Sequence, residues 1–335
     1  MKAVGYRKPL PITEPEALTD LTLDKPQPAG RDLLVKVMAV AVNPVDTKVR
    51  RNMAPATDAP RILGFDAAGI VEATGPDASL FRPGDAVFYA GDITRPGTNA
   101  EYHLVDERIV GAKPQSLDFP AAAALPLTAI TAWEMLFDRF GLKRGDSRGS
   151  ILIVGGAGGV GSIAIQLARQ LTGLTVLATA SRAETRDWVT QLGAHHVLDH
   201  SQPMPPQLQA LGIDGVDYLF STTETARHLA TYAEIIAPQG RIGVIDDPDS
   251  LDILPFKRKA VSVHWEFMFA RPMFRTADMQ AQHDLLNEVA RLVDSGTLRT
   301  TLAEVLGPIT AKNLRQAHAA IESGRTRGKL VLAGF

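Results

Sequence analysis

A glycine-rich stretch, ILIVGGAGGVGS at residues 151–162, is the pattern that most clearly predicts chemistry. An apolar run of strand type precedes its glycines, and a segment with helical spacing follows them. Glycine lets a ligand approach the backbone closely, and the unpaired N–H groups of a first helical turn attract a phosphate. The stretch therefore predicts a dinucleotide site, and a tight turn without a ligand is the alternative. The predicted contacts are Gly156, Ala157, Gly158, Gly159, Val160 and Gly161.

The end of the next predicted strand indicates which dinucleotide is bound. A site for NAD usually places Asp or Glu there, on the ribose 2′-hydroxyl, but this strand ends in Ser181 and Arg182, with no acid before Glu184. A carboxylate would repel a 2′-phosphate by about 4 kcal/mol, whereas an arginine attracts it through hydrogen bonds of roughly 1.5–3 kcal/mol each. Ser181, Arg182 and, one helical turn on, Arg186 therefore predict NADP(H). Ordinary surface charges at a helix start are the alternative.

These residues need strands and helices that hold them at one edge of a sheet. Between residues 151 and 267, strand-like apolar runs alternate with segments of helical spacing. The predicted strands cover residues 151–154, 175–180, 195–200, 216–222, 241–247 and 260–267, and the predicted helices cover residues 159–171, 184–192 and 225–240. Such alternation predicts an α/β fold with a doubly wound parallel sheet that is covered on both faces.

The chain on either side of this part has a different texture. Its first third consists of short runs such as DLLVKVMAVAVN and GDAVFYAGD, bounded by Gly, Pro and Asp, which predict a small barrel or a partly open sheet. Past about residue 275, a helix, a strand, a second helix and a last strand are predicted. We therefore expect a discontinuous β-rich domain of residues 1–124 and 276–335, interrupted by an α/β domain of residues 125–275.

Composition limits the classes of protein and partner. The 335 residues carry a formal net charge of −2, so there is no basic excess for a nucleic-acid backbone. The chain has no cysteine, which removes disulfides, thiol nucleophiles and thiolate metal ligands. The N-terminus lacks a signal-peptide core, and the stretch AAAALPLTAITAW is broken by Pro126 and too short to span a bilayer. The expectation is a soluble cytoplasmic protein with a small-molecule substrate.

Several motifs in the same order resemble those of the medium-chain dehydrogenase/reductase superfamily, in its quinone oxidoreductase-like branch. The most similar members are the proteins called zinc-type alcohol dehydrogenase-like. The motifs are VNPVDTKVR at residues 42–50, LGFDAAGIV at residues 63–71, AAALPLTAITAWE, GGAGGVGS and the terminal GRTRGKLVL. The resemblance runs nearly from end to end. It implies an N-terminal GroES-like domain, a Rossmann domain and an active site in the cleft between them.

The resemblance also allows the zinc ligands of the family to be compared with the residues of this chain. In zinc-dependent relatives, Cys, His and a second Cys hold the catalytic metal, and a glutamate follows the His. Here Asn43 stands at the first Cys, Phe65 and Asp66 replace the His and the Glu, and the second Cys cannot exist. Because a catalytic zinc needs three protein ligands, a zinc-independent member without a metal site is expected. An alcohol dehydrogenase with an atypical metal site is an alternative.

Without a metal, the expected reaction is hydride transfer from NADPH to a quinone or an α,β-unsaturated carbonyl. The nicotinamide supplies the hydride, and such acceptors delocalise the negative charge that develops. Asn43 is the candidate catalytic group because its amide can donate to a substrate oxygen; Asp46 shares its motif, and Tyr89 is a candidate proton donor. A turn-forming Asn43 and a helix-capping Asp46 are the alternatives. For the whole chain, the alternative is a non-catalytic NADPH-binding sensor or structural protein.

The resemblance supplies further cofactor contacts and an oligomeric state. Thr128 resembles a residue at a helix start that contacts the cofactor, and Lys329 is placed to reach the pyrophosphate, with surface charge as the alternative. Ile245 and Phe267, near the ends of the last two predicted strands, are further expected contacts. In the family the edge strand pairs around a two-fold axis, so the aromatic residues of HWEFMF (residues 264–269) indicate a homodimer. Packing in the core or beside the nicotinamide is the alternative.

Overall fold

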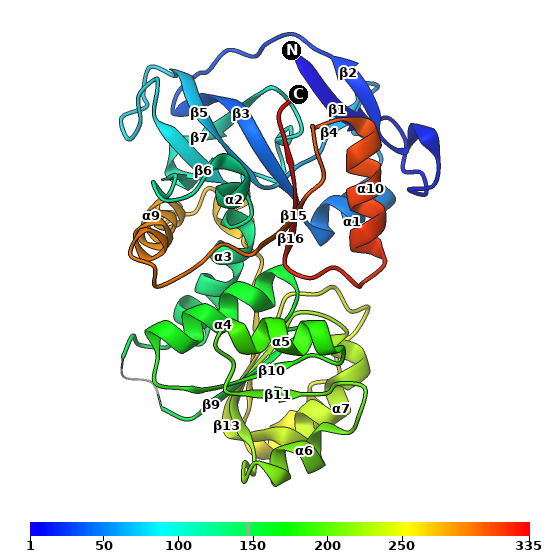
Figure 1. Cartoon of the computed structure of the whole chain (residues 1–335), viewed down its shortest axis with the longest axis vertical. Coiled ribbons are helices and arrows are strands. Elements are labelled where there is room, and N and C mark those ends of the chain that lie inside the picture. The colour runs from blue at the N-terminus through cyan, green and yellow to red at the C-terminus, as the bar shows by residue number, and fades with distance from the viewer. Residues whose placement is uncertain (146–147) are drawn as a thin grey trace. The chain divides into compact units, whose positions relative to one another are not determined.

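The computed structural model describes residues 1–145 and 148–335, and its internal contacts divide the chain into two units (Figure 1). Unit 1 consists of Met1–Ile130 and Phe269–Phe335, and unit 2 consists of Thr131–Met268. The chain therefore passes twice between the units, and unit 2 is one continuous segment inserted into unit 1.

Both ends of unit 2 lie inside the limits of residues 125 and 275 that the sequence analysis sets. Residues 125–130 stay with unit 1 because the backbone N–H of Leu127 donates to the carboxylate of Asp66 over 2.7 Å. Phe269 stays there as well, since its ring packs edge-on against that of Phe65 with centroids 5.2 Å apart. Sequence patterns do not show these contacts, because they join residues at least 61 positions apart.

Unit 2 is built on a six-stranded parallel sheet with the strand order β11-β10-β9-β12-β13-β14. Its strands are β9 (Ser150–Val154), β10 (Thr175–Thr179), β11 (His196–Leu198), β12 (Val216–Ser221), β13 (Ile236–Val244) and β14 (Ser262–Trp265). Counted along the chain, this is the order 3-2-1-4-5-6 of the Rossmann fold. The predicted α/β fold with a doubly wound parallel sheet is therefore confirmed.

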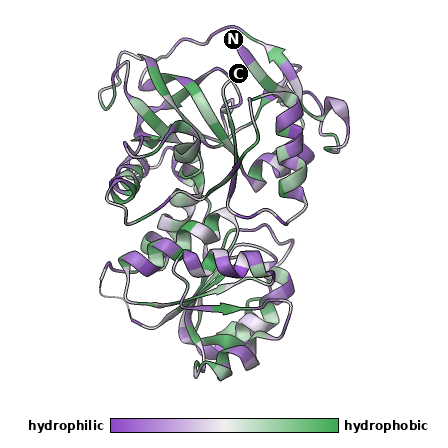
Figure 2. Cartoon of the chain, in the orientation of Figure 1, coloured by the Kyte–Doolittle hydropathy of each residue, from purple (hydrophilic) through white to green (hydrophobic). Residues whose placement is uncertain are grey.

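Helices cover both faces of this sheet. They are α4 (Gly159–Leu171), α5 (Ala183–Gln191), α6 (Met204–Ala210) and α7 (Thr225–Ile235), with the short η4 (Leu254–Lys259). Helices α4 and α5 lie on one face, and α6 and α7 lie on the other (Figure 1). Figure 2 shows mostly hydrophobic residues in the strands and both kinds in the helices. Every residue of β9 is buried, as expected of a strand covered on two faces.

Two helices of unit 2 differ from the sequence prediction. The helix predicted for residues 225–240 ends at Ile235, and Ile236 already pairs with Val216 in the sheet. Pro238 lacks the N–H that a helix interior needs, so this segment is more stable as a strand. Helix α6 is not predicted because its Pro–Pro pair is a turn signal in the sequence, although proline is tolerated in a first helical turn.

Unit 1 contains two sheets. The larger has seven strands in the order β15-β16-β3-β5-β6-β8, with β7 paired to β3, and the smaller has the order β2-β1-β4. The strands are β1 (Lys2–Tyr6), β2 (Thr19–Thr22), β3 (Asp32–Val42), β4 (Arg61–Ile62), β5 (Ala67–Thr74), β6 (Ala86–Tyr89), β7 (Tyr102–Asp106), β8 (Val110–Ala112), β15 (Leu302–Val305) and β16 (Lys329–Ala333). Strand β16, from the end of the chain, pairs antiparallel with β3, so both segments of the unit share one sheet.

The helices of unit 1 pack around these sheets. They are α1 (Pro44–Asn52), α2 (Phe119–Ala123), α3 (Pro126–Trp133), α8 (Ala270–Phe274), α9 (Ala281–Asp294) and α10 (Ala311–Glu322), with the short η1 (Pro15–Ala17) and η2 (Glu107–Ile109). Helix α3 carries the chain into unit 2, where the π-helical η3 (Glu134–Arg139) continues it. Within the described residues, only the stretch Phe119–Arg139 is long and apolar enough to cross a membrane, and 78% of its apolar window is buried inside the protein.

Two buried carboxyl groups of unit 2 lie close to the points where the chain passes between the units. Glu134 is 1% exposed and Glu266 is 4% exposed, and Arg139 donates to one oxygen of Glu266 over 2.8 Å. The other oxygen of Glu266 finds no donor among the described residues. Burial, together with the neighbouring carboxyl of Glu134, raises the pKa of Glu266 to about 9. At neutral pH the carboxyl of Glu266 is therefore protonated.

Replacing Glu266 by Gln should make the stability of the protein less dependent on pH. The pKa of Glu266 is raised from 4.5 to about 9 in the folded protein, so its contribution to stability is fully present below pH 4.5 and is lost as the pH rises toward about 9. In Glu266→Gln, the amide donates toward Glu134 at every pH, so the melting temperature should fall less between neutral and alkaline pH than it does in the wild type.

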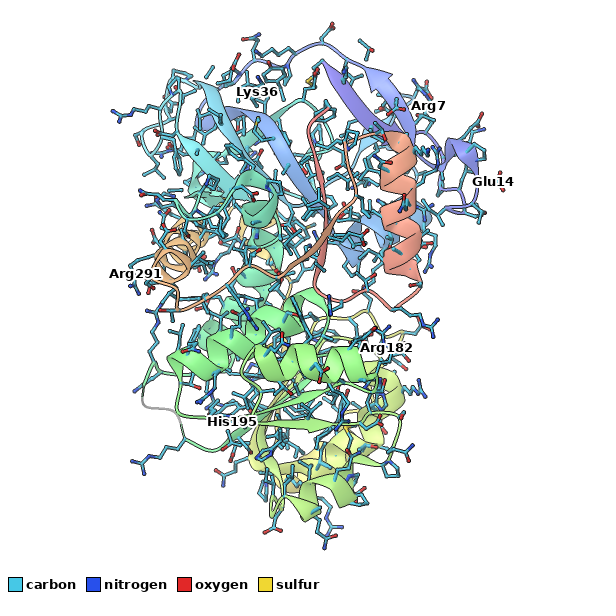
Figure 3. The ribbon with its side chains drawn as sticks, viewed as in Figure 1. Arg7, Glu14, Lys36, Arg182, His195 and Arg291 are labelled. Atoms are coloured by element: carbon cyan, nitrogen blue, oxygen red, sulfur yellow. The ribbon has the colours of Figure 1, made fainter. Side chains whose placement is uncertain are left out.

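Thermal melting across this pH range tests the raised pKa of Glu266. Glu14→Gln, at an exposed position of unit 1, is the control and should keep the wild-type profile (Figure 3). Identical slopes for the wild type and Glu266→Gln would show that Glu266 does not titrate in this range.

Candidate functional site

The glycine loop follows β9 at the carboxyl edge of the unit 2 sheet and leads into α4, as the sequence predicts. The N–H of Gly155 donates to Oγ1 of Thr179 over 3.0 Å, and the N–H of Gly156 donates to the carbonyl oxygen of Thr179 over 3.2 Å. These bonds tie the loop to the end of β10. Gly161 packs so closely that a Cβ would overlap the carbonyl oxygen of Gly155. Packing alone therefore requires glycine at Gly161, and this position is no evidence of a ligand.

Gly158 is the glycine that packing does not explain. It is the N-cap of α4 with a φ of −70°, which any residue adopts, and a Cβ there would find nothing nearer than 3.4 Å. A side chain would fit the protein itself but would fill the space in front of the first turn of α4. The open space favours a group that approaches the unpaired N–H groups of that turn, and a phosphate is suited to them.

The end of β10 carries the residues expected to select the cofactor. Ser181 is half-buried, and Arg182 is the N-cap of α5 (Figure 3). The Arg182 guanidinium pairs with Glu184 over 2.9 Å, and the two side chains are 40% and 61% exposed. A pair this exposed contributes about 1 kcal/mol or less, so a phosphate can replace Glu184 as the partner. Arg186, one turn further along α5, is exposed.

The other predicted contacts of unit 2 lie at the same edge of the sheet. Ile245 follows β13 and Phe267 follows β14, and because all six strands are parallel, their carboxyl ends share one edge with the glycine loop. Phe267 is 48% exposed. A separate pocket of about 920 Å³ is lined by Gly149, Asp217 and Lys259, among others, at the amino ends of the strands. It is therefore no part of the nucleotide edge.

A buried polar network in unit 1 contains Asn43, which aligns with a zinc ligand, and Asp66, which aligns with the glutamate after the histidine ligand. Lys329, at the start of β16, donates its ammonium N–H groups to Oδ2 of Asp66 over 2.8 Å, to the carbonyl of Val42 over 3.2 Å and to the amide oxygen of Asn43. Asn43 donates through Nδ2 to the same oxygen of Asp66 over 2.7 Å. The Lys329 and Asp66 side chains are 3% and 0% exposed. The network is therefore an ion pair inside the protein, with a hydrogen-bond acceptor for each N–H of the ammonium.

The two aspartates connect this network to the surrounding backbone. The other oxygen of Asp66 accepts the N–H of Leu127 over 2.7 Å, which places negative charge at the start of α3, where the helix dipole favours it. Asp46, the third residue of α1, accepts the N–H groups of Asn43 over 2.8 Å and of Gly64 over 3.0 Å. Asp46 and Asn43 thus form a capping box, which is the helix-capping role given above as the alternative to a catalytic role for Asp46. Burial raises the pKa of Asp46 to about 7 and also raises the pKa of Asp66.

These contacts bear on the roles predicted for Asn43 and Lys329. Asn43 is 1% exposed, and both ends of its amide already have partners in the network. Its donation to a substrate oxygen therefore stays a prediction. The ammonium of Lys329 has three acceptors inside unit 1. Its contact with a pyrophosphate would require some of these bonds to break, and it stays a prediction as well.

Tyr89 and Thr128 are also buried in unit 1. The hydroxyl of Tyr89 lies 3.2 Å from Nδ1 of His103, and burial raises its pKa above the usual value of 10. A hydroxyl that is both buried and a weaker acid is poorly suited to proton donation, so this role remains untested. Thr128 is 2% exposed and donates to the carbonyl of Leu125 over 3.0 Å, and its contact with the cofactor likewise stays a prediction.

Sequence reasoning did not find the pairing of Lys329 with Asp66. A signal was available, because Asp66 stands in the apolar run LGFDAAGIV, and a carboxylate buried there needs a cation or several donors. The partner could not be chosen from the sequence, since Lys329 lies 263 positions further along the chain.

The residues present do not fit a catalytic zinc. The chain has no cysteine, and Phe65, which aligns with the histidine ligand, offers only carbon atoms and is 1% exposed. Asp66 already binds an ammonium, whose positive charge would repel a metal ion. Over residues 1–145 and 148–335, no group of three or more His, Cys, Asp or Glu side chains could hold a metal ion. The described residues of unit 1 therefore offer no set of ligands for a catalytic zinc.

Comparison with known proteins yields two family matches. Residues 29–115 match the family described as "Alcohol dehydrogenase GroES-like domain". Residues 192–332 match the family described as "Zinc-binding dehydrogenase". The first match lies within unit 1, and the second covers much of unit 2 and the end of unit 1.

Relatives extend over nearly the whole chain. The "Zinc-type alcohol dehydrogenase-like protein SAS2087" of Staphylococcus aureus (strain MSSA476) is 44% identical and covers 99% of both chains. The 2-methylene-furan-3-one reductase of Solanum lycopersicum is 30% identical over 90% of this chain and 71% of its own. The mitochondrial NAD(P)H oxidoreductase RTN4IP1 of Mus musculus is 30% identical over 90% and 81%.

A solved structure is more similar still. It is a protein of Rhizobium etli CFN 42 whose name assigns it provisionally to the zinc-dependent alcohol dehydrogenases. It is 62% identical, covers 100% of this chain and 98% of its own, and superimposes with a TM-score of 0.96. Its name describes that protein, and the residues of the present chain decide whether a zinc fits here.

Proposed function

Because the chain belongs to the medium-chain dehydrogenase/reductase superfamily, whose members here are oxidoreductases with a nicotinamide cofactor, we propose that it reduces a quinone or an α,β-unsaturated carbonyl with NADPH. The observation that carries the proposal is the 2.8 Å ion pair of Lys329 with Asp66, the residue that follows Phe65 at the position of the histidine ligand. The relative named for 2-methylene-furan-3-one reduction acts on such an enone, which supports this acceptor class.

The proposed reaction moves a hydride and then a proton. NADPH held at the glycine loop and Arg182 would supply the hydride for the electron-poor carbon of an enone, or for the quinone. The resulting enolate or quinol anion would take its proton from water. A zinc ion would stabilise the negative charge on an isolated carbonyl by several kcal/mol. Conjugated acceptors spread that charge over their own atoms, and therefore need no metal.

Oxidation of NADPH by the pure protein should depend strongly on the acceptor. Quinones and enones should be reduced with kcat/KM values about 100-fold or more above those of saturated aldehydes of the same size. A saturated aldehyde lacks conjugation, and without a metal nothing supplies the several kcal/mol that would stabilise the charge on its oxygen. The measurement is initial NADPH oxidation across a matched panel, such as an enone and its saturated analogue.

Two results of this panel would redirect the proposal. Efficient reduction of saturated aldehydes would favour the alcohol dehydrogenase alternative. Tight NADPH binding without turnover of any acceptor would favour a non-catalytic NADPH-binding protein.

The choice of NADPH over NADH is argued from the end of β10. Ser181 and Arg182 follow this strand after Ala180, and neither repels a 2′-phosphate. In place of the exposed ion pair with Glu184, Arg182 would form charge-assisted hydrogen bonds to the phosphate, each worth roughly 1.5–3 kcal/mol. The exchange of partners is therefore favourable for NADPH, and it has no counterpart for NADH.

Changing Arg182 to Ala should weaken NADPH binding about tenfold or more and leave NADH binding nearly unchanged, because only NADPH carries the 2′-phosphate. Fluorescence titration gives both dissociation constants. Arg291→Ala is the matched control, since Arg291 forms an ion pair with Glu288 in unit 1 over 2.7 Å and is 61% exposed (Figure 3). Equal dissociation constants of the wild type for NADPH and NADH would overturn the NADP(H) assignment.

We also propose that the protein is a homodimer that pairs through β14. This strand is at the edge of the six-stranded sheet and pairs only with β13 in the described structure. Trp265 and Phe267 at its end are 54% and 48% exposed. An edge strand with free N–H and C=O groups and exposed aromatic side chains favours pairing with a second copy.

Trp265→Glu should therefore convert the dimer into a monomer, because a charge would be buried at the two-fold contact. Sedimentation equilibrium measures the mass, and Met53→Glu, at a residue that is 46% exposed in unit 1, is the control. A wild-type protein that sediments as a monomer would contradict the pairing.

A further inference from the structure

The network around Lys329 places a positive charge beside Asn43 and Asp66 inside unit 1. We infer that Lys329 is the resident cation of unit 1 and acts as a positioning residue that holds three separate segments together. These segments are the junction of β3 and α1, the residue before β5 and the first turn of α3. The inference rests on contacts inside unit 1, and only its turnover measurements rest on the function proposed above.

The contacts of the ammonium join segments that lie far apart in the sequence. Through Val42 and Asn43 it holds the junction of β3 and α1. Through Asp66 it holds the residue before β5, and the other oxygen of Asp66 holds the N–H of Leu127 in α3. The ammonium therefore reaches the first turn of α3 through one carboxylate.

An ammonium suits this position because its geometry matches the acceptors. It has three N–H groups, and a carbonyl, an amide oxygen and a carboxylate oxygen surround it. The lysine backbone is anchored as well, since its N–H donates to the carbonyl of Thr301 over 2.9 Å. The next residue, Leu330, is in register with Val42 of β3. The cation is thus part of the sheet itself, and a chelator cannot remove it.

Loss of the ammonium would leave the carboxylate of Asp66 buried without an opposite charge. Breaking one partner of a buried ion pair is strongly destabilising, whereas replacing both partners with neutral groups is often nearly neutral. The pKa of Asp66 is already raised by burial, and Lys329 is the largest influence that opposes this rise. Without Lys329, the pKa of Asp66 should therefore rise further, and the stability lost should partly return as the pH is lowered.

The experiment compares three variants with the wild type by thermal melting. Lys329→Met should lower the melting temperature by about 5 °C or more, and part of this loss should disappear between pH 8 and pH 6. The double variant Lys329→Met/Asp66→Asn should recover at least half of the loss at pH 8, because no unpaired charge remains. Lys312→Met, at an exposed lysine of unit 1, should melt like the wild type.

Chelation and metal analysis test whether the resident cation is Lys329 or a metal. EDTA should leave the melting temperature of the wild type unchanged, and metal analysis should find no stoichiometric zinc. One zinc per chain, or a melting temperature that falls with EDTA, would overturn the inference. If Lys329→Met does not fold, the double variant decides: its folding supports the ion pair, and its failure to fold contradicts it.

Turnover separates a positioning role from a purely stabilising one. A misplacement of about 1 Å can cost up to about 100-fold in rate, so the double variant should be stable yet have a kcat lowered about tenfold or more with the best acceptor. A stable double variant with wild-type kcat would show that Lys329 only stabilises the fold. Absence of turnover in the wild type would overturn the proposed function alone, because melting and metal analysis decide the identity of the cation without it.

Discussion

Taking a lysine ammonium and an aspartate carboxylate out of water costs several kcal/mol per ion. Unit 1 offsets this cost by surrounding Lys329 and Asp66 with hydrogen-bond partners until no N–H of the ammonium lacks an acceptor. The same requirement explains why Asn43 faces inward, since its amide completes the shell around both charges. This network joins the start of α1, the residue before β5 and the start of α3.

Unit 2 follows a different constraint. Its parallel strands bring loops from distant parts of the chain to one edge, where the open space at Gly158 faces the first turn of α4. Packing requires glycine at Gly161, whereas Gly158 leaves open space that suits a phosphate. The contribution of unit 1 is instead the buried network of Lys329, Asp66 and Asn43.

Much of unit 2 could be predicted from the sequence because its signals are local. The apolar run before the glycines, the helical spacing after them and the arginine at the end of the next strand are each recognised from a short segment of the chain. The prediction was wrong where a local signal was ambiguous. The segment after Ile235 has a helical pattern, but pairing with Val216 makes it a strand.

The glycine loop, the absence of cysteine and Phe65 can be recognised without a structure, because they depend only on which residues are present. The pairing of Lys329 with Asp66 and the place of Asn43 in their network follow from the folded chain alone. These residues are separated by up to 286 positions, and the antiparallel register of β16 with β3 brings them together. A buried charge requires a partner, but the fold alone selects which of the chain's cations is within reach.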